Sequence, residues 1–518
     1  MDRQIRRLGF AFVALFAILF AQVAYVQVVA SGRIAADPAN AARQIRAEYS
    51  VERGQILAAD ERTVLAKSIP NRDPDSVYKF LRVYPGGSLY GQLTGYYSRI
   101  YGYSGLERAM NPYLAGTAPE FTAQNLTDII LGRPKVGGTV VTTIEPALQQ
   151  AAKTALGAHL GAVVALDPTT GDVLAMWSNP GFDPEPLSTG TSDDITAAWN
   201  ELIHDPQKPL VSKAFQELYL PGSTFKLVTA SAALEHGWTP DKTWPNPHVL
   251  DLPQSSSTLE NFGNELCNGG ASSVTMLEAF TESCNVTFGE IGLELYRHDP
   301  SALSQQAFAY GWCPILPPGQ ITCAEPTVPF TLPWEPGRFP EPAYFQENLP
   351  KVALSAVGLD NDKQNPMQLA LETAAIANGG TLMEPKLVTE IRDSAGRTIK
   401  TFGDVAYGRP ISEQTASDMR TMMISVVEHG TGTEAQIPGW VVAGKTGTST
   451  NCGLEPNCTT PPNAWFTAFA GPPGQQPHIA VAAIVIDGGS LGSEATGGRV
   501  AAPIVKQVIE TYRTTLGR

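Results

Sequence analysis

The sequence predicts an α+β fold in which the first and last strands of a large domain share one sheet around a helix-rich middle part. The apolar segments 161–166 and 173–177 are separated by DPTTGD, a turn sequence that predicts a hairpin. Three further strands and a closing helix are predicted near the C-terminus, at residues 440–443, 465–470, 479–486 and 501–515. Helical patterns and Pro-rich loops fill the long interval between the two sets.

The overall composition indicates a folded protein of several domains without a nucleic-acid partner. Its 518 residues correspond to two or three units of about 150 residues. The 43% hydrophobic and 17% charged residues are ordinary for globular proteins. A net charge of −14 argues against nucleic-acid binding, because phosphate contacts require clustered Lys and Arg.

The first thirty residues predict a single transmembrane anchor at the cell membrane. Residues 8–30 are 23 largely apolar residues without a charge, enough to cross about 30 Å of hydrocarbon. Arg3, Arg6 and Arg7 precede them, which favours a cytoplasmic tail over residues 1–7 and an extracytoplasmic location for the rest of the chain. A cleaved signal peptide is the alternative, but its apolar region is usually about 7 to 15 residues long.

Two folded domains are expected after the anchor, a small α+β domain over residues 31–155 and the large domain over 156–518. Apolar residues recur throughout the first segment, so it is not a linker. Near its end, TVVTTI at residues 139–144 predicts a strand, and residues 145–156 predict a helix with proline in its first turn.

The six cysteines are compatible with disulfides, because an exported chain meets an oxidising environment. Cys452 and Cys458 lie close together in a Gly/Pro/Asn-rich loop, so a bridge between them is expected; free thiols are the alternative. No metal site is expected, because the seven histidines are scattered and no HExxH or Cys-x-x-Cys motif occurs.

The first segment able to carry chemistry is LPGSTFK at residues 220–226, which opens the apolar stretch FKLVTASAALEHG. Glycines on both sides predict a helix of about fourteen residues, with Ser223 and Lys226 on one face of its first turn. A serine hydroxyl becomes a nucleophile when a base removes its proton, and burial would lower the pKa of Lys226 toward the neutral amine required. A surface Ser/Lys pair without function is the alternative, because SxxK alone is a frequent pattern.

Ser283 and Asn285 form a second candidate, sixty residues further on, after the helical pattern SSVTMLEAFTE. A hydroxyl and a carboxamide at a helix end can relay protons and bind a substrate amide. A simple helix cap is the alternative interpretation of this SxN triplet.

The third candidate is GKTGT at residues 444–448, directly after the strand pattern WVVA. Lys445 and Thr446 on a strand could bind a carboxylate, and Gly447 would permit close approach of a substrate or a facing helix. Residues 439–446 also match the phosphate-binding pattern GxxxxGK[ST]. Nucleotide binding is disfavoured, because the apolar strand lies inside this match and the following residues do not favour a helix.

SxxK, SxN and KTG in this order form a specific set, although each motif is weak alone. On these residues the chain resembles class B penicillin-binding proteins, and most of all the actinobacterial type called penicillin-binding protein A. The resemblance covers essentially the whole length, including RGQI at 53–56, GLE at 105–107 and YLPGSTFK at 219–226. It departs at Cys284 inside SxN, and at 358–360, where Gly-Leu-Asp stands in place of a frequent Gly-Gln-Gly.

The resemblance implies a transpeptidase fold, an antiparallel sheet sandwiched by helices with a helical subdomain, behind a small membrane-proximal pedestal. It implies a peptidoglycan D,D-transpeptidase that cross-links stem peptides ending in D-Ala-D-Ala during septation and is acylated by β-lactam antibiotics. Ser223 would be the nucleophile, Lys226 its base and Ser283 a proton relay. Backbone amides of Ser223 and Thr448 would hold the oxyanion, and the substrate would be bound by Asn285, Lys445, Thr446, Gly447 and Thr448.

No cofactor is implied, and a membrane-embedded glycosyltransferase is the expected partner. The roughly 120 residues between the anchor and the catalytic domain are too few for a glycosyltransferase domain. The resemblance therefore suggests a polymerase of the shape, elongation, division and sporulation family, together with division proteins.

Three alternative functions are compatible with the motifs. A β-lactamase would be a small secreted domain without an anchor and a pedestal. A D,D-carboxypeptidase would use water in place of the acceptor amine. A non-catalytic scaffold of a division or elongation complex would not require the complete set of catalytic residues.

Overall fold

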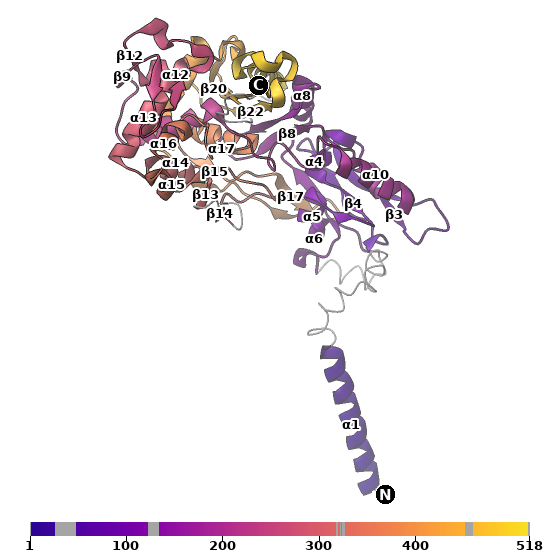
Figure 1. Cartoon of the computed structure of the whole chain (residues 1–518). Helices are drawn as coiled ribbons and strands as arrows, with labels where there is room; N and C mark the ends of the chain where they lie inside the picture. The colour runs from indigo at the N-terminus through magenta and orange to yellow at the C-terminus, as the bar shows by residue number, and fades with distance from the viewer. Residues whose placement is uncertain are drawn as a thin grey trace.

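The computed structural model describes residues 2–25, 48–122, 134–316, 320–321, 323, 327–450 and 459–515. Figure 1 shows the N-terminal helix α1, a larger part around a central sheet, and a smaller part. We call the smaller part the pedestal; its sheet is formed by strands between residues 56 and 142 and between residues 388 and 401. The nucleophile motif predicted from the sequence lies in the larger part.

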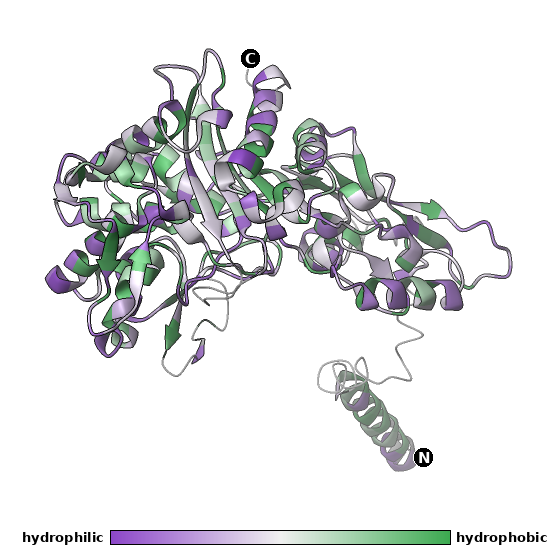
Figure 2. Cartoon of the chain, turned by 45° about the horizontal axis from the view of Figure 1, so that its top comes forward, coloured by the Kyte–Doolittle hydropathy of each residue, from purple (hydrophilic) through white to green (hydrophobic). Residues whose placement is uncertain are grey.

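Helix α1 (Asp2–Ala24) is apolar along most of its length, as its colour in Figure 2 shows. Its stretch Arg6–Ala24 has a mean hydropathy of 2.0 and is not buried against the protein, so by length and composition it could cross a membrane. The helix begins at Asp2, six residues before the predicted membrane span over 8–30, and residues 26–30 of that span lie outside the described residues.

The larger part is built on a five-stranded antiparallel sheet in the order β20-β21-β22-β7-β8. Its strands are β7 (Gly161–Leu166), β8 (Val173–Asn179), β20 (Val441–Ser449), β21 (Asn463–Gly471) and β22 (Ile479–Val485). Because β22 pairs with β7, the prediction that both ends of the domain share one sheet is confirmed. Strand β20 is longer than predicted and contains GKTGT itself.

Helices cover both faces of this sheet, which explains why its strands are apolar without alternation. Helices α8 (Pro146–Leu156) and α19 (Ala502–Thr515) pack on one face, in a cluster with Val163 and Val481. Helix α17 (Pro366–Ala377) covers the other face, where Val164 and Ala482 belong to a second cluster. Side chains at successive strand positions therefore enter different cores.

The helical middle part packs beside the sheet. Its main helices are α11 (Lys226–Glu235), α12 (Met276–Thr281), α13 (Asn285–His298), α14 (Ala302–Ala309), α16 (Leu349–Ser355) and α18 (Glu413–Glu428). The pattern at 272–282 is helical only over α12, because Thr275 and Glu278 form a capping box at its start. The three residues before it form strand β12 (Ser273–Thr275), which pairs with β9 (Thr243–Pro245).

The pedestal sheet combines strands from two distant parts of the chain. Its order is β18-β17-β6-β1-β2-β3, and its strands are β1 (Ile56–Leu57), β2 (Val64–Pro70), β3 (Phe80–Val83), β6 (Thr139–Thr142), β17 (Val388–Arg392) and β18 (Thr398–Thr401). Since β17 and β18 come from the middle of the large domain, the two parts are tied through one sheet. The boundary at residue 155 stays a prediction.

A buried ion triad holds the pedestal together. The Glu107 carboxylate accepts hydrogen bonds of 2.6 Å from Nε of Arg53 and 2.6 Å from Nε of Arg82. All three side chains are at most 5% exposed. The RGQI and GLE segments named in the sequence therefore meet in one charge cluster.

The remaining α-helices and strands of the described residues lie outside these main groups. They are α4 (Gly91–Thr94), β4 (Tyr97–Ser98), β5 (Gly102–Tyr103), α5 (Gly105–Ala109), α6 (Asn111–Leu114), α9 (Glu185–Ser188), α10 (Ser192–His204), β9 (Thr243–Pro245), β10 (Val249–Asp251), β11 (Thr258–Glu260), β13 (Cys313–Leu316), β14 (Gln320–Ile321), β15 (Arg338–Pro340), α15 (Pro342–Gln346), β16 (Leu382–Met383) and β19 (Ala406–Gly408).

Two disulfides occur in the described part of the chain, Cys267–Cys284 and Cys313–Cys323. The first joins the SxN motif to a loop 17 residues earlier in the sequence. The predicted bridge between Cys452 and Cys458 lies outside the described residues.

Candidate active site

The candidate nucleophile Ser223 lies in a single 3₁₀ turn, η4 (Gly222–Phe225), that leads directly into helix α11. In a 3₁₀ turn, side chains three residues apart eclipse one another. Oγ of Ser223 accordingly lies 3.0 Å from Nζ of Lys226. The predicted helix of about fourteen residues is present over residues 222–235, with a 3₁₀ first turn, and it pairs Ser223 with Lys226 as expected.

Gly222 has a backbone conformation that the turn requires. Its φ is +53°, and a Cβ atom there would lie 2.4 Å from the carbonyl oxygen of Thr448. Its N–H donates a 3.0 Å hydrogen bond to the carbonyl of Gly358. Close backbone contacts on two sides therefore fix the position of the nucleophile.

Lys226 is fully buried below the nucleophile, and its surroundings suit a neutral amine. Nζ lies 2.6 Å from the carbonyl oxygen of Ser283 and 2.8 Å from Oδ1 of Asn285. Burial, and secondarily the nearby Lys445, lower the pKa of Lys226 well below its ordinary value. A neutral amine donates its two N–H groups to those two oxygens, and its lone pair is then free to accept the Ser223 proton.

Ser283 occupies the space between the two lysines. Its Oγ lies 3.4 Å from Nζ of Lys226 and accepts a 2.8 Å hydrogen bond from Nζ of Lys445. Its backbone has a φ of +63°, which is uncommon for a residue with a side chain. Such outliers occur at functional sites when the surroundings enforce them, and the disulfide of the adjacent Cys284 constrains this loop.

Asn285 is the first residue of α13, but its side chain does not cap that helix. Its Oδ1 faces Lys226, and its Nδ2 donates a 3.1 Å hydrogen bond to the carbonyl of Glu260. The first backbone N–H groups of α13 are instead satisfied by Oδ1 of Asn261, which accepts from residues 285 and 286 at 2.7 and 3.0 Å. The helix-cap alternative for the SxN triplet is therefore wrong, and the carboxamide is available to the site.

Lys445 projects from β20, the edge strand of the sheet, and is fully buried. Burial lowers its pKa to about 7. Next to it, Gly447 lies against the nucleophile turn, because a Cβ atom there would meet Cγ2 of Thr224 at 2.7 Å. The predicted role of Gly447 in close packing against a facing helix is thus visible in the contacts.

The hydroxyls of Thr446 and Thr448 face a common space. Oγ1 of Thr446 lies 2.6 Å from Oγ1 of Thr431, and Oγ1 of Thr448 accepts a 3.4 Å hydrogen bond from the N–H of Gly497. The nucleotide-binding alternative for residues 439–446 is excluded, because Thr446 lies inside β20 and no helix follows it there.

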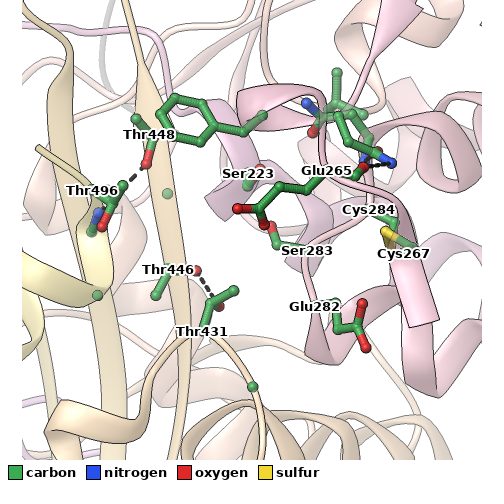
Figure 3. A pocket seen from close by; sticks show the side chains of 18 of the residues that line it. Ser223, Glu265, Cys267, Glu282, Ser283, Cys284, Thr431, Thr446, Thr448 and Thr496 are labelled. Carbon is green, nitrogen blue, oxygen red and sulfur yellow. Dashed lines mark hydrogen bonds between the residues drawn. A yellow bond between two sulfur atoms is a disulfide. The ribbon is translucent and has the colours of Figure 1, made fainter. Parts of the chain in front are cut away.

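These side chains surround a cavity of about 770 Å³. Figure 3 shows Ser223 and Ser283 near each other in this cavity, with Thr446 and Thr448 on the strand across from them. The predicted residues that line it are Ser223, Ser283, Asn285, Thr446, Gly447 and Thr448. Lys226 and Lys445 lie beneath this lining and reach the site through their Nζ atoms. All eight predicted residues are thus brought together.

The sequence interpretation missed several residues of the site, among them Asn261, Thr431 and Gly497. None belongs to a pattern that carries chemistry, and each becomes relevant only through a contact between distant segments. The Gly-Thr-Gly run around Thr431 is the one visible signal, because glycines indicate close backbone approach. Residues 358–360 are the segment where this sequence has Gly-Leu-Asp and not the frequent Gly-Gln-Gly. There, Leu359 lines the cavity, and Asp360 accepts a hydrogen bond from the Tyr344 hydroxyl.

One group of possible metal ligands occurs in the described residues, Cys267, Glu282 and Cys284, whose ligand atoms lie within 4.8 Å of one another. The two cysteines form a disulfide and so offer no thiolates.

Comparison with known proteins agrees with this geometry. Residues 161–510 match the penicillin binding protein transpeptidase domain, and residues 53–140 match the penicillin binding protein A dimerisation domain. The chain belongs to the penicillin-binding transpeptidase family. The expected fold, an antiparallel sheet sandwiched by helices and preceded by a pedestal and an apolar helix, is confirmed.

Similar penicillin-binding transpeptidases are known from mycobacteria. The chain is 38% identical to the peptidoglycan D,D-transpeptidase PbpA of Mycolicibacterium smegmatis, over 98% of both chains. It is 36% identical to PbpA of Mycobacterium tuberculosis, over 98% of this chain and 99% of the relative. The ceftriaxone acyl-enzyme of penicillin-binding protein A from M. tuberculosis superposes with a TM-score of 0.80, at 36% identity, covering 90% of this chain and 99% of that one.

Proposed function

We propose that this chain is a peptidoglycan D,D-transpeptidase that cross-links stem peptides through an acyl-enzyme on Ser223. The observation that carries the proposal is the contact between Ser223 and the buried Lys226, 3.0 Å apart, in a cavity that also holds Ser283 and GKTGT. The mycobacterial relatives of similar length bear the same activity in their names.

In the acylation step, Oγ of Ser223 attacks the carbonyl carbon between the two terminal D-alanines, and its proton passes to Nζ of Lys226. The new bond joins Oγ to that carbon, and the C–N bond to the last D-alanine breaks. The departing amine needs one proton, and Ser283 can deliver it, because its Oγ lies between the two lysine nitrogens at 3.4 and 2.8 Å. The proton taken by Lys226 thus leaves with D-alanine.

The site binds two negatively charged groups of the substrate, the developing oxyanion and the terminal carboxylate. The backbone amides of Ser223 and Thr448 hold the developing oxyanion, an effect worth about 3 to 4 kcal/mol for one donor in comparable sites. Lys445, Thr446 and Thr448 bind the terminal carboxylate, while Asn285 orients the substrate amide and Gly447 leaves room for the peptide along the edge of β20. An acceptor amine then attacks the acyl carbon, its nitrogen forms the cross-link, and Ser223 regains its proton.

The proposed chemistry would take place outside the cytoplasm. We infer a cytoplasmic tail over 1–7, a membrane span over 8–30, a pedestal over 31–155 and a catalytic domain over 156–518. Three arginines before the span and the apolar character of α1 support this topology. A membrane-embedded glycosyltransferase would then supply the glycan strands, and the role would be in septation.

Intact-mass spectrometry of the full-length protein in detergent, after exposure to benzylpenicillin, tests the proposal. One persistent adduct that is absent from Ser223→Ala is expected. No adduct on folded protein would contradict the proposal, and rapid loss of the adduct would indicate a β-lactamase. A second assay with stem peptides separates the remaining outcomes: a dimeric product is expected, whereas release of D-alanine alone would indicate a carboxypeptidase.

A further inference from the structure

The two hydroxyls proposed to bind the substrate carboxylate each form a hydrogen bond with a group from another part of the chain. The hydroxyl of Thr446 lies 2.6 Å from the hydroxyl of Thr431, and the hydroxyl of Thr448 accepts a 3.4 Å hydrogen bond from the N–H of Gly497. Both pairs line the cavity, and a dashed line in Figure 3 joins Thr431 to Thr446. Thr431 comes from the loop after α18 and belongs to none of the three motifs.

We propose that Thr431 is a positioning residue, which turns the hydroxyl proton of Thr446 toward the substrate carboxylate. This inference rests on the proposed function, because it requires an anionic substrate group beside Thr446. It goes further in naming a residue outside the motifs that determines how strongly that anion is recognised.

The argument follows from the number of protons available. A threonine hydroxyl has one proton to donate and two lone pairs with which to accept. If Thr431 donates to Thr446, the proton of Thr446 remains free for the anion. The opposite orientation would direct a lone pair of Thr446 at the carboxylate, so a bound anion selects the first. The N–H of Gly497 does the same for Thr448 without ambiguity, because an amide nitrogen can only donate.

The backbone around Thr431 is held by contacts on two sides. Its N–H donates a 3.3 Å hydrogen bond to the carbonyl of Thr281, the last residue of α12. A Cβ atom at Gly498 would lie only 2.2 Å from the carbonyl oxygen of Thr431, and one at Gly430 only 2.2 Å from that of Thr281. Thr431 therefore ties the helix before Ser283 to the GKTGT strand.

Acylation of the full-length protein by benzylpenicillin and by its methyl ester, which lacks the carboxylate, tests this role. The wild type is expected to react faster with the acid. Thr431→Val should slow the acid by about 3- to 10-fold, the usual effect of losing one hydrogen bond between neutral groups, and leave the ester within twofold. Thr431→Ser keeps the hydroxyl and should restore the ratio of acid to ester. Thr433→Val, at an exposed position two residues further on and outside the cavity lining, should not change that ratio.

Equal loss with acid and ester in Thr431→Val would show a merely structural effect and overturn the inference, as would no loss with either compound. A wild type that does not distinguish acid from ester would overturn it together with the carboxylate role of Thr446. A wild type that neither compound acylates would contradict the proposed function itself.

Discussion

Replacing Gly447 by Ala is expected to slow acylation by about 30- to 100-fold without unfolding the protein. The added Cβ atom would lie 2.7 Å from Cγ2 of Thr224 and 3.0 Å from the carbonyl oxygen of Pro221, whereas ordinary contact begins at 3.4 Å. Strand β20 and the nucleophile turn must therefore separate by about 0.7 Å to clear Thr224. Because a displacement of about 1 Å can cost about 100-fold in rate, we expect about 2 to 2.7 kcal/mol in the acylation barrier.

The separation matters because the two proposed oxyanion donors lie on opposite sides of this contact, Ser223 on the turn and Thr448 on the strand. The assay is the second-order rate constant of acylation by benzylpenicillin, followed by intact mass, with thermal unfolding measured alongside. Gly408→Ala serves as the control, because no atom lies within 4 Å of a Cβ there. Acylation of folded Gly447→Ala within threefold of the wild-type rate would refute the idea that close contact between the strand and the turn aligns the oxyanion donors.

Three further predictions concern buried charges. Acylation of the wild type should slow as the pH falls, because protonated Lys226 cannot accept the Ser223 proton. Acylation of Lys226→Arg should be at least about 100-fold slower across the neutral and alkaline range, since the guanidinium group stays protonated. Acylation rates from stopped-flow measurements or intact mass check both predictions. Burial raises the pKa of Glu372 from 4.5 to about 8, so its contribution to stability is complete below about pH 4.5 and is lost as the pH rises through about 8. Urea unfolding across that range should show this loss in the wild type, and a loss of the same size in Glu372→Gln would contradict the assignment. Glu107→Gln leaves two buried guanidinium groups without their carboxylate and should lower the free energy of unfolding by about 3 to 5 kcal/mol; a thermal midpoint equal to that of the wild type would rule out this role for the triad.

Local sequence was sufficient to predict those structural features whose signal lies within a single helix, strand or turn. The apolar strands of the large sheet, the hairpin between β7 and β8 and the apolar N-terminal helix follow from hydrophobic runs and turn residues that act over a few positions. The spacing of Ser223 and Lys226 likewise predicts their pairing, since any helical turn brings residues three apart together. The boundaries were less accurate: β20 runs on through GKTGT, and the nucleophile turn is 3₁₀.

The order of the three motifs indicated the family, but the sequence could not show how they meet. Ser283 lies between Lys226 and Lys445 because a disulfide and a left-handed backbone hold its loop, and nothing near Ser283 in sequence predicts that Cys284 pairs with Cys267. Long-range pairings also brought β17 and β18 into the pedestal sheet, although they follow β6 by more than 200 residues. Such contacts depend on the shape of the whole core and leave no local periodicity.

By itself, then, the sequence determined the residue types of the site, the strands and helices that carry them, and the apolar N-terminal helix, because these depend on spacing and hydrophobicity. Only the tertiary structure decided the state and orientation of the reacting groups. Lys226 has a lowered pKa because its nitrogen is buried, and Thr446 gains a hydroxyl partner because the loop of Thr431 packs beside β20. Burial and contact between distant segments are properties of the folded chain, and they bring eight ordinary residues together in one candidate site.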